Sequence, residues 1–173
     1  MKTAAKRVVL APVLAIALIG AAATGEAFAA KAGPVTKKCG MLKQKAAKQR
    51  CLKQNQANRV AFNQIKNSRF EGTRGDGEAV NSVYCANGKF ESRTSGSYGT
   101  GISTGKRWMI DEAVVRQGGK WIDAFLKDGD GYEVAIQRRG SQWKLGVASL
   151  GRILYPGDME KTNAAGDCAK LVV

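Results

Sequence analysis

The sequence predicts an α+β protein in which an N-terminal basic helix precedes a mainly antiparallel β meander. Two observations carry this prediction. Residues 37–66 are rich in Lys, Gln, Ala and Arg, contain no proline, and are therefore good helix formers. After residue 72 the pattern changes to short β-branched and aromatic runs separated by glycines, which is typical of strands joined by tight turns. We expect a signal peptide over 1–29, a basic helical segment over 30–70 and an antiparallel β domain over 71–173.

The first 29 residues have the features of a secretory signal peptide. Three basic residues precede an apolar run over 8–23, and Ala27 and Ala29 place small residues where a signal peptidase cleaves. The run is shorter than the roughly 20 residues that span a bilayer, and Pro12 interrupts it. We expect export to the periplasm or the medium after cleavage near Ala29, and no transmembrane segment in the mature chain.

Nearly all of the net positive charge of the mature chain lies in the predicted basic helical segment. Residues 30–70 hold eleven basic and no acidic residues, whereas residues 71–173 hold fourteen basic and thirteen acidic ones. The first half of the predicted helix has too few apolar residues to bury a face, whereas the second half can dock on the sheet through Val60, Phe62 and Ile65. The cations that we expect to bind a partner are Lys37, Lys38, Lys43, Lys45, Lys48, Arg50 and Lys53.

The cysteines indicate two disulfides. Their number is even, none belongs to a C-x-x-C pair, and all of them follow the leader, namely Cys39, Cys51, Cys85 and Cys168. In one continuous helix Cys39 and Cys51 would be about 18 Å apart, which is too far for a bond. Either the helical segment breaks between them, or each cysteine bonds to Cys85 or Cys168. We expect the second arrangement.

Six or seven strands are predicted in the β domain. They are expected to form an antiparallel meander that is either a small barrel or a curled sheet. A hairpin joins 80–86 to 89–93 through Asn87-Gly88, which suits a type I′ turn. A Gly/Ser/Thr loop covers 95–105. Further strands are expected over 108–117, 120–127, 132–139, 142–150 and 152–155, the last ending at Pro156-Gly157.

Two of these hairpins share the pattern R-x-G-x-x-W. In one, Arg116 faces Trp121; in the other, Arg138 faces Trp143. A guanidinium over an indole stabilises a hairpin, and such pairs also suit sugars or anionic polymers. In the first hairpin, Ala113, Val115, Ile122, Ala124 and Leu126 are expected to face the core. The opposite face is either a ligand surface or the seat of the N-terminal helix, and its members are Glu112, Val114, Arg116, Trp121, Asp123 and Phe125.

Several kinds of chemistry are excluded or disfavoured. The chain has no histidine, so it cannot build a Ser-His-Asp or Cys-His nucleophile system or a histidine-ligated metal site. No cofactor and no metal are expected. Carboxylate catalysis is the remaining enzyme class, with Glu112 and Asp123 as the pair that a small glycan hydrolase would need beside Trp121.

These features favour a non-catalytic, exported binding protein. Its basic helix would engage an anionic polymer or surface, such as a cell-wall polymer, an acidic polysaccharide or a lipid headgroup, through a sequence-blind Coulomb attraction. The helix has no aromatic residue before Phe62, so specific nucleic-acid recognition is not expected.

An inhibitor of a secreted hydrolase is the second function class. Small exported sheets with a tyrosine beside a strand cysteine, here Tyr84-Cys85, superficially resemble bacterial lysozyme inhibitors. The match covers a handful of residues and none of the inhibitory loop. Because lysozyme is basic, it would repel a mature chain of net charge +12.

Overall fold

A computed structural model describes residues 33–34, 37–97, 99–128 and 133–173. The expected leader over 1–29 lies outside these residues. The sheet consists of nine antiparallel strands and a two-residue strand, β1 (Gly33–Pro34), that pairs in parallel with β6. The antiparallel strands are β2 (Ser68–Thr73), β3 (Ala79–Tyr84), β4 (Phe90–Gly96), β5 (Gly99–Gly105), β6 (Trp108–Arg116), β7 (Trp121–Asp128), β8 (Glu133–Arg139), β9 (Gln142–Ser149) and β10 (Arg152–Asn163).

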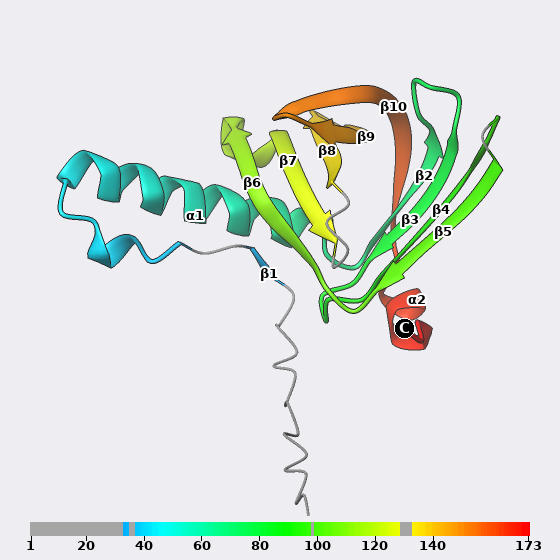
Figure 1. Ribbon diagram of the computed structural model, residues 1–173, viewed down its shortest axis with the longest axis horizontal. Helices are drawn as coiled ribbons and strands as arrows, with labels where there is room; N and C mark the ends of the chain where they lie inside the picture. Colours follow the sequence, from blue (N-terminus) through cyan, green and yellow to red (C-terminus); the bar gives the residue numbers. More distant parts are fainter. Residues whose placement is uncertain (1–32, 35–36, 98, 129–132) are drawn as a thin grey trace, which may run out of the picture.

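The antiparallel strands run across the sheet in the order β6-β7-β8-β9-β10-β2-β3-β4-β5. The sheet curls into a half-barrel, in which β6 and β7 stand on one side and β2 to β5 on the other (Figure 1). Strands β5 and β6 are consecutive in the chain, yet they lie at opposite ends of this order. Strand β10 joins the two halves because it pairs with β9 along one edge and with β2 along the other.

The strand count exceeds the predicted six to seven for identifiable reasons. The expected loop over 95–105 is strand β5, whose seven residues pair with β4 from Phe90↔Gly105 to Gly96↔Gly99. The residues just after the helix form β2. Strand β10 does not end at Pro156-Gly157: its register with β9 shifts between Leu154 and Gly157, and the strand then continues to Asn163.

The turn at Asn87-Gly88 also differs from the expected type I′ turn. The Gly88 amide donates to the Cys85 carbonyl oxygen at 3.1 Å, and the Cys85 amide donates to the Lys89 carbonyl oxygen at 2.9 Å. Gly88 alone in this turn has a positive φ, of 98°. A type I turn followed by a left-handed glycine therefore closes the hairpin.

Helix α1 (Lys45–Ile65) is shorter at its N-terminal end than the predicted 37–66. A short 3-10 helix, η1 (Cys39–Met41), precedes it, and the chain folds back between the two. This reversal brings the Cα atoms of Cys39 and Cys51 to 5.6 Å, and the two residues form a disulfide. The second disulfide joins Cys85 to Cys168. The expected bonding of Cys39 and Cys51 to the sheet is thus wrong, because the helical segment breaks between them.

The C-terminal half of α1 packs into the curled sheet. Ala61 and Ile65 are fully buried in the same apolar cluster as Ile110, Ala113 and Ile122. The ring of Phe62 stacks on that of Trp108, with centroids 5.0 Å apart. The helix therefore rests on the core side of β6 and β7. The predicted docking is confirmed for Phe62 and Ile65, whereas Val60, the third residue of that prediction, is half-buried and is not part of this cluster.

Helix α1 also covers the edge of β6. The Gln54 side chain donates to the Ala113 carbonyl oxygen at 2.8 Å, and buried Asn58 donates to the Asp111 carbonyl oxygen at 3.1 Å. Because an exposed edge carbonyl can pair with another chain, these amide side chains both anchor the helix and protect the edge.

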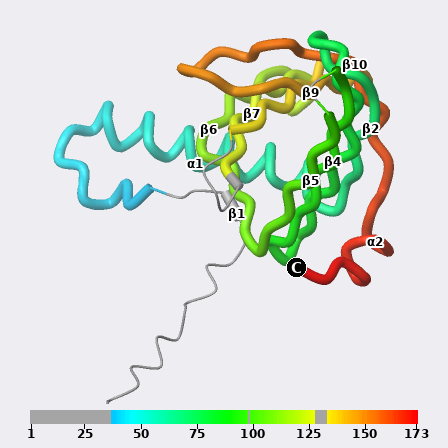
Figure 2. Tube along the Cα trace, turned by 45° about the vertical axis from the view of Figure 1, so that its right-hand side comes forward, coloured from blue at the N-terminus to red at the C-terminus, as the bar shows by residue number. Residues whose placement is uncertain are grey.

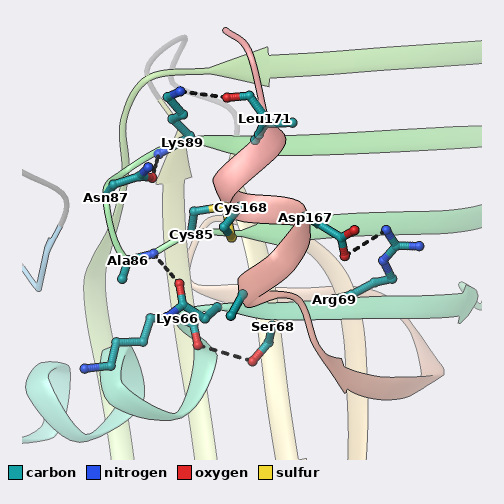
Figure 3. The surroundings of a disulfide bond; sticks show 12 residues. Lys66, Ser68, Arg69, Cys85, Ala86, Asn87, Lys89, Asp167, Cys168 and Leu171 are labelled. Atoms are coloured by element: carbon teal, nitrogen blue, oxygen red, sulfur yellow. Dashed lines mark hydrogen bonds and ion pairs between the residues drawn. A yellow bond between two sulfur atoms is a disulfide. The ribbon is translucent and has the colours of Figure 1, made fainter.

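A short helix, α2 (Ala165–Lys170), follows β10 and was not predicted. The Cys85–Cys168 disulfide attaches it to the end of β3 (Figure 3). Arg69 forms an ion pair of 3.1 Å with Asp167, and the Lys89 ammonium donates to the Leu171 carbonyl oxygen at 2.6 Å. The C-terminal part of the chain is therefore held against β2, β3 and the turn that follows β3.

Candidate functional sites

The first candidate site is the basic segment, residues 37–53. It includes η1 and the first turns of α1, and it extends away from the sheet in both views of the molecule (Figures 1 and 2). Its seven predicted binding cations are all exposed: Lys37, Lys38, Lys43, Lys45, Lys48, Arg50 and Lys53. Within the described part of the chain, none of the seven forms an ion pair with a carboxylate.

This segment is held in one shape by two kinds of contact. The Cys39–Cys51 disulfide closes it, and Cys39 is only 4% exposed. The Lys37 amide donates to the Asn55 side-chain oxygen at 2.9 Å, and the Asn55 side chain donates back to the Lys37 carbonyl oxygen at 3.0 Å. The residues ahead of the helix are therefore fixed against its first turns, and this closed segment carries seven exposed positive charges.

The Arg/Trp pairs are in the predicted register but differ from each other. Arg116 is the cross-strand neighbour of Trp121, and Arg138 is that of Trp143. The guanidinium that covers Trp121 belongs to Arg139 of β8, 4.1 Å from the ring centroid, and not to Arg116, which is exposed. The pairing of Arg138 with Trp143 is confirmed: the Arg138 guanidinium lies 5.3 Å from the centroid of the Trp143 ring.

Asp123 is occupied by partners on the outer face of the sheet. Its carboxylate accepts from Arg139 at 2.5 Å and from Gln137 at 2.8 Å. Glu112 lies exposed on the same outer face, opposite Phe125. Because Asp123 is already held by a guanidinium and an amide, its role here is to fasten β7 to β8.

A cationic hollow is the second candidate site. It lies between the C-terminal end of α1 and the strands β8 to β10, with a volume of about 480 Å³. Its lining includes Lys66, Arg138, Trp143 and Lys161, together with several amide side chains. The Lys161 ammonium is 5.3 Å from the centroid of the Trp143 ring, the same distance as the Arg138 guanidinium. Trp143 is only 9% exposed, so it forms the floor of this hollow and offers no open stacking platform.

The electrostatics of the hollow depend on burial and on like charge. Partial burial lowers the pKa of Lys161, and the neighbouring positive charge of Arg138 lowers it further. Sequence reasoning missed Lys161 because it ended the last strand at Pro156-Gly157. The continuation of β10 beyond its bend places Lys161 beside Trp143.

A third hollow, of about 180 Å³, lies on the concave face of the half-barrel and has a largely apolar lining that includes Tyr84, Phe90 and Trp108. Its charged lining residues are already neutralised. Arg74 is paired with Asp76 and Glu78, and Lys127 is paired with Asp111 and Glu133. Within the described chain, this hollow therefore presents no unpaired positive charge to an anion.

Two general features bear on location. Within the described ranges, no helix is long and apolar enough to cross a membrane. The two disulfides are compatible with an exported protein, because such bonds persist in oxidising compartments.

No protein-family model matches the chain, and no curated protein sequence or solved structure is significantly similar to it.

Proposed function

We propose that this chain is an exported, non-catalytic binding protein whose basic segment engages an anionic polymer or surface outside the cytoplasm. The observation that supports the proposal is the basic segment of residues 37–53, which carries seven exposed cations and which the disulfide closes at the free end of α1. The half-barrel serves as the scaffold that anchors this surface through the buried C-terminal half of the helix.

The physical basis is electrostatic attraction between the basic segment and its partner, with a small loss of conformational entropy on binding. Seven cations that carry no ion pair within the described residues retain their charge for a partner, whereas paired cations would have to break a contact first. Because the disulfide fixes the turn before α1, fewer conformations are lost on binding. Cell-wall polymers, acidic polysaccharides and anionic headgroups all present the repeated negative charge that such a surface attracts.

The test compares two variants of equal net charge. Lys43, Lys48 and Lys53 are replaced by Gln in the first variant; Lys106, Lys120 and Lys170, which are also exposed but lie elsewhere, are replaced by Gln in the second. The full chain and both variants are titrated against heparin, lipoteichoic acid and phosphatidylglycerol vesicles over a salt series.

We expect the wild type to bind with an affinity that falls as salt rises, since each phosphate or sulfate contact releases about one counterion. The first variant should bind more weakly and show a shallower salt dependence, while the second should retain most of the wild-type affinity. Equal losses in the two variants would assign the attraction to net charge alone and contradict the proposal, as would an absence of binding to all three probes.

A further inference from the structure

The cationic hollow at the C-terminal end of α1 differs from several other charged positions on the sheet. Carboxylates pair with the cations in Arg69–Asp167, Arg139–Asp123 and Lys144–Asp158, whereas the exposed Arg116 and Arg152 form no ion pair within the described residues. Arg138 and Lys161 have no carboxylate partner among the described residues, and none of the described residues lining the hollow is acidic. Like charges are therefore brought together here without compensation.

The arrangement of Arg138 leaves part of its guanidinium available. Its Nε donates to the Gly140 carbonyl oxygen at 2.8 Å, and its Nη1 donates to the Gln64 side-chain oxygen at 2.5 Å and to the Gly119 carbonyl oxygen at 3.3 Å. These bonds fix the plane of the group. Within the described chain its Nη2 has no such bond, so that the remaining donor is held in a defined position.

Two asparagine side chains in the lining, Asn67 and Asn163, add hydrogen-bond donors to the hollow. The Asn67 side-chain oxygen accepts from the Ala86 amide at 2.9 Å, and the Asn163 side-chain oxygen accepts from the Ala165 amide at 2.9 Å. With both oxygens occupied, the groups that Asn67 and Asn163 can offer to a ligand are their NH₂ donors. The hollow thus combines cations and hydrogen-bond donors, which is the chemistry of an anion site.

From this convergence we infer that the hollow is a binding site for a phosphate or sulfate group carried by a molecule of about the size of a sugar. The two cations beside Trp143, on Arg138 and Lys161, are offset better by a phosphate monoester, of charge about −1.5 to −2 at neutral pH, than by a single carboxylate. The volume of about 480 Å³ lies within the range of small-molecule sites and exceeds what a lone phosphate fills. Trp143 supplies an apolar floor under the charged group.

This inference is independent of the proposed role of the basic segment. The two sites lie at opposite ends of α1, a helix of 21 residues that is therefore about 30 Å long. Variants at one site can accordingly be used as controls for the other.

The experiment measures binding of inorganic phosphate, inorganic sulfate and glucose 6-phosphate to the full chain by calorimetry, with acetate and glucose as controls. The indole N–H signal of Trp143 in a ¹H–¹⁵N spectrum, assigned with Trp143→Phe, reports on the hollow directly. Lys161→Gln and Lys66→Gln remove one charge each at the hollow, and Lys53→Gln removes one from the basic segment. Far-ultraviolet circular dichroism verifies that each variant is folded.

We expect saturable binding of glucose 6-phosphate that shifts the Trp143 signal and exceeds the binding of acetate and glucose. Lys161→Gln should weaken it about tenfold and Lys66→Gln less, whereas Lys53→Gln should leave it unchanged. A comparison of phosphate with sulfate identifies which oxyanion the site prefers, and either preference supports the inference. Equal weakening by Lys53→Gln and Lys161→Gln, or no shift of the Trp143 signal up to about 50 mM ligand, well above a millimolar dissociation constant, would overturn it.

Discussion

The indole N–H of Trp108 donates a hydrogen bond of 2.7 Å to the carbonyl oxygen of Cys85. Both residues are fully buried, and Cys85 also carries the disulfide to Cys168. Trp108 further contacts the rings of Phe62 and Tyr84, at centroid distances of 5.0 and 5.3 Å. One side chain thus connects helix α1, strand β6 and the covalent link to the C-terminal helix.

Replacing Trp108 with Phe should destabilise the protein by about 2–3 kcal/mol. The substitution removes one of two donors to the buried Cys85 carbonyl oxygen, which keeps its bond from the Gly88 amide, and this loss costs about 1 kcal/mol. The smaller ring also leaves a cavity in the core, which adds about 1–2 kcal/mol. Chemical denaturation measures the loss. Trp121→Phe, on the half-buried outer face, should cost clearly less, so that an equal effect of the two substitutions would disprove the role assigned to the Trp108 bond.

The two disulfides should differ in what they stabilise. Cys85 and Cys168 are 83 residues apart, so their replacement by Ala should lower the free energy of unfolding by about 4 kcal/mol, as expected for a loop of this length. The Cys39–Cys51 pair spans 12 residues and holds only the segment before α1 to that helix. Its replacement by Ala should affect unfolding of the sheet less and weaken binding to heparin. The opposite order in the denaturation midpoints would contradict this assignment.

Stability should fall at acidic pH through Asp76. Burial alone would raise the pKa of Asp76, but its hydrogen bond to Arg74, the Glu78 amide and the charge of Arg74 outweigh this effect and lower the pKa below its ordinary value. Because the pKa in the unfolded chain is higher, near 4, the stabilisation is complete above that pH and is lost as the pH falls through the lower folded value. Denaturant titrations between about pH 2 and 6 should show this decline, and Asp76→Asn should flatten it. An unchanged slope in that variant would exclude Asp76 as its source.

Gly157 should not tolerate a side chain. A Cβ at this position would lie 1.9 Å from the Thr73 carbonyl oxygen, where the backbones of β10 and β2 approach closely. Gly157→Ala should therefore cost more than about 2 kcal/mol and alter the bend of β10, since backbone atoms would have to move. At Gly166 in α2, a Cβ would meet no atom within 4 Å, and Gly166→Ala should be neutral or stabilising by up to about 1 kcal/mol. Thermal denaturation of both variants decides the comparison.

The local features of the fold followed from the sequence because they depend on neighbouring residues. Alternation placed Ala113, Ile122 and Ala124 on the core face, and the hairpin pattern predicted the registers of Arg116 with Trp121 and of Arg138 with Trp143. The apolar residues near the end of the helix predicted its docking. The spacing of apolar residues along the sequence predicts local interactions of this kind.

The remaining features depend on contacts between distant residues. Strand β5 is rich in small residues and forms because β4 pairs with it, so that its own composition suggested a loop. The disulfide pairing depended on a chain reversal before Lys45 that helix propensity alone does not reveal. At the cationic hollow, Arg138 and Trp143 were predicted to meet, but Lys161 joins them only because β10 continues beyond its bend.

The order of the strands has a consequence for how the chain folds. Strands β2 to β5 and β6 to β10 are two successive meanders, each built from contacts between neighbours in sequence, whereas the pairing of β10 with β2 joins residues about ninety positions apart. Because such non-local closure costs the most chain entropy, we expect the two meanders to form first and their union to be the slow step. The Cys85–Cys168 bond spans that same junction. We therefore expect the Cys85–Cys168 disulfide to form last, so that its formation indicates that the two meanders have paired.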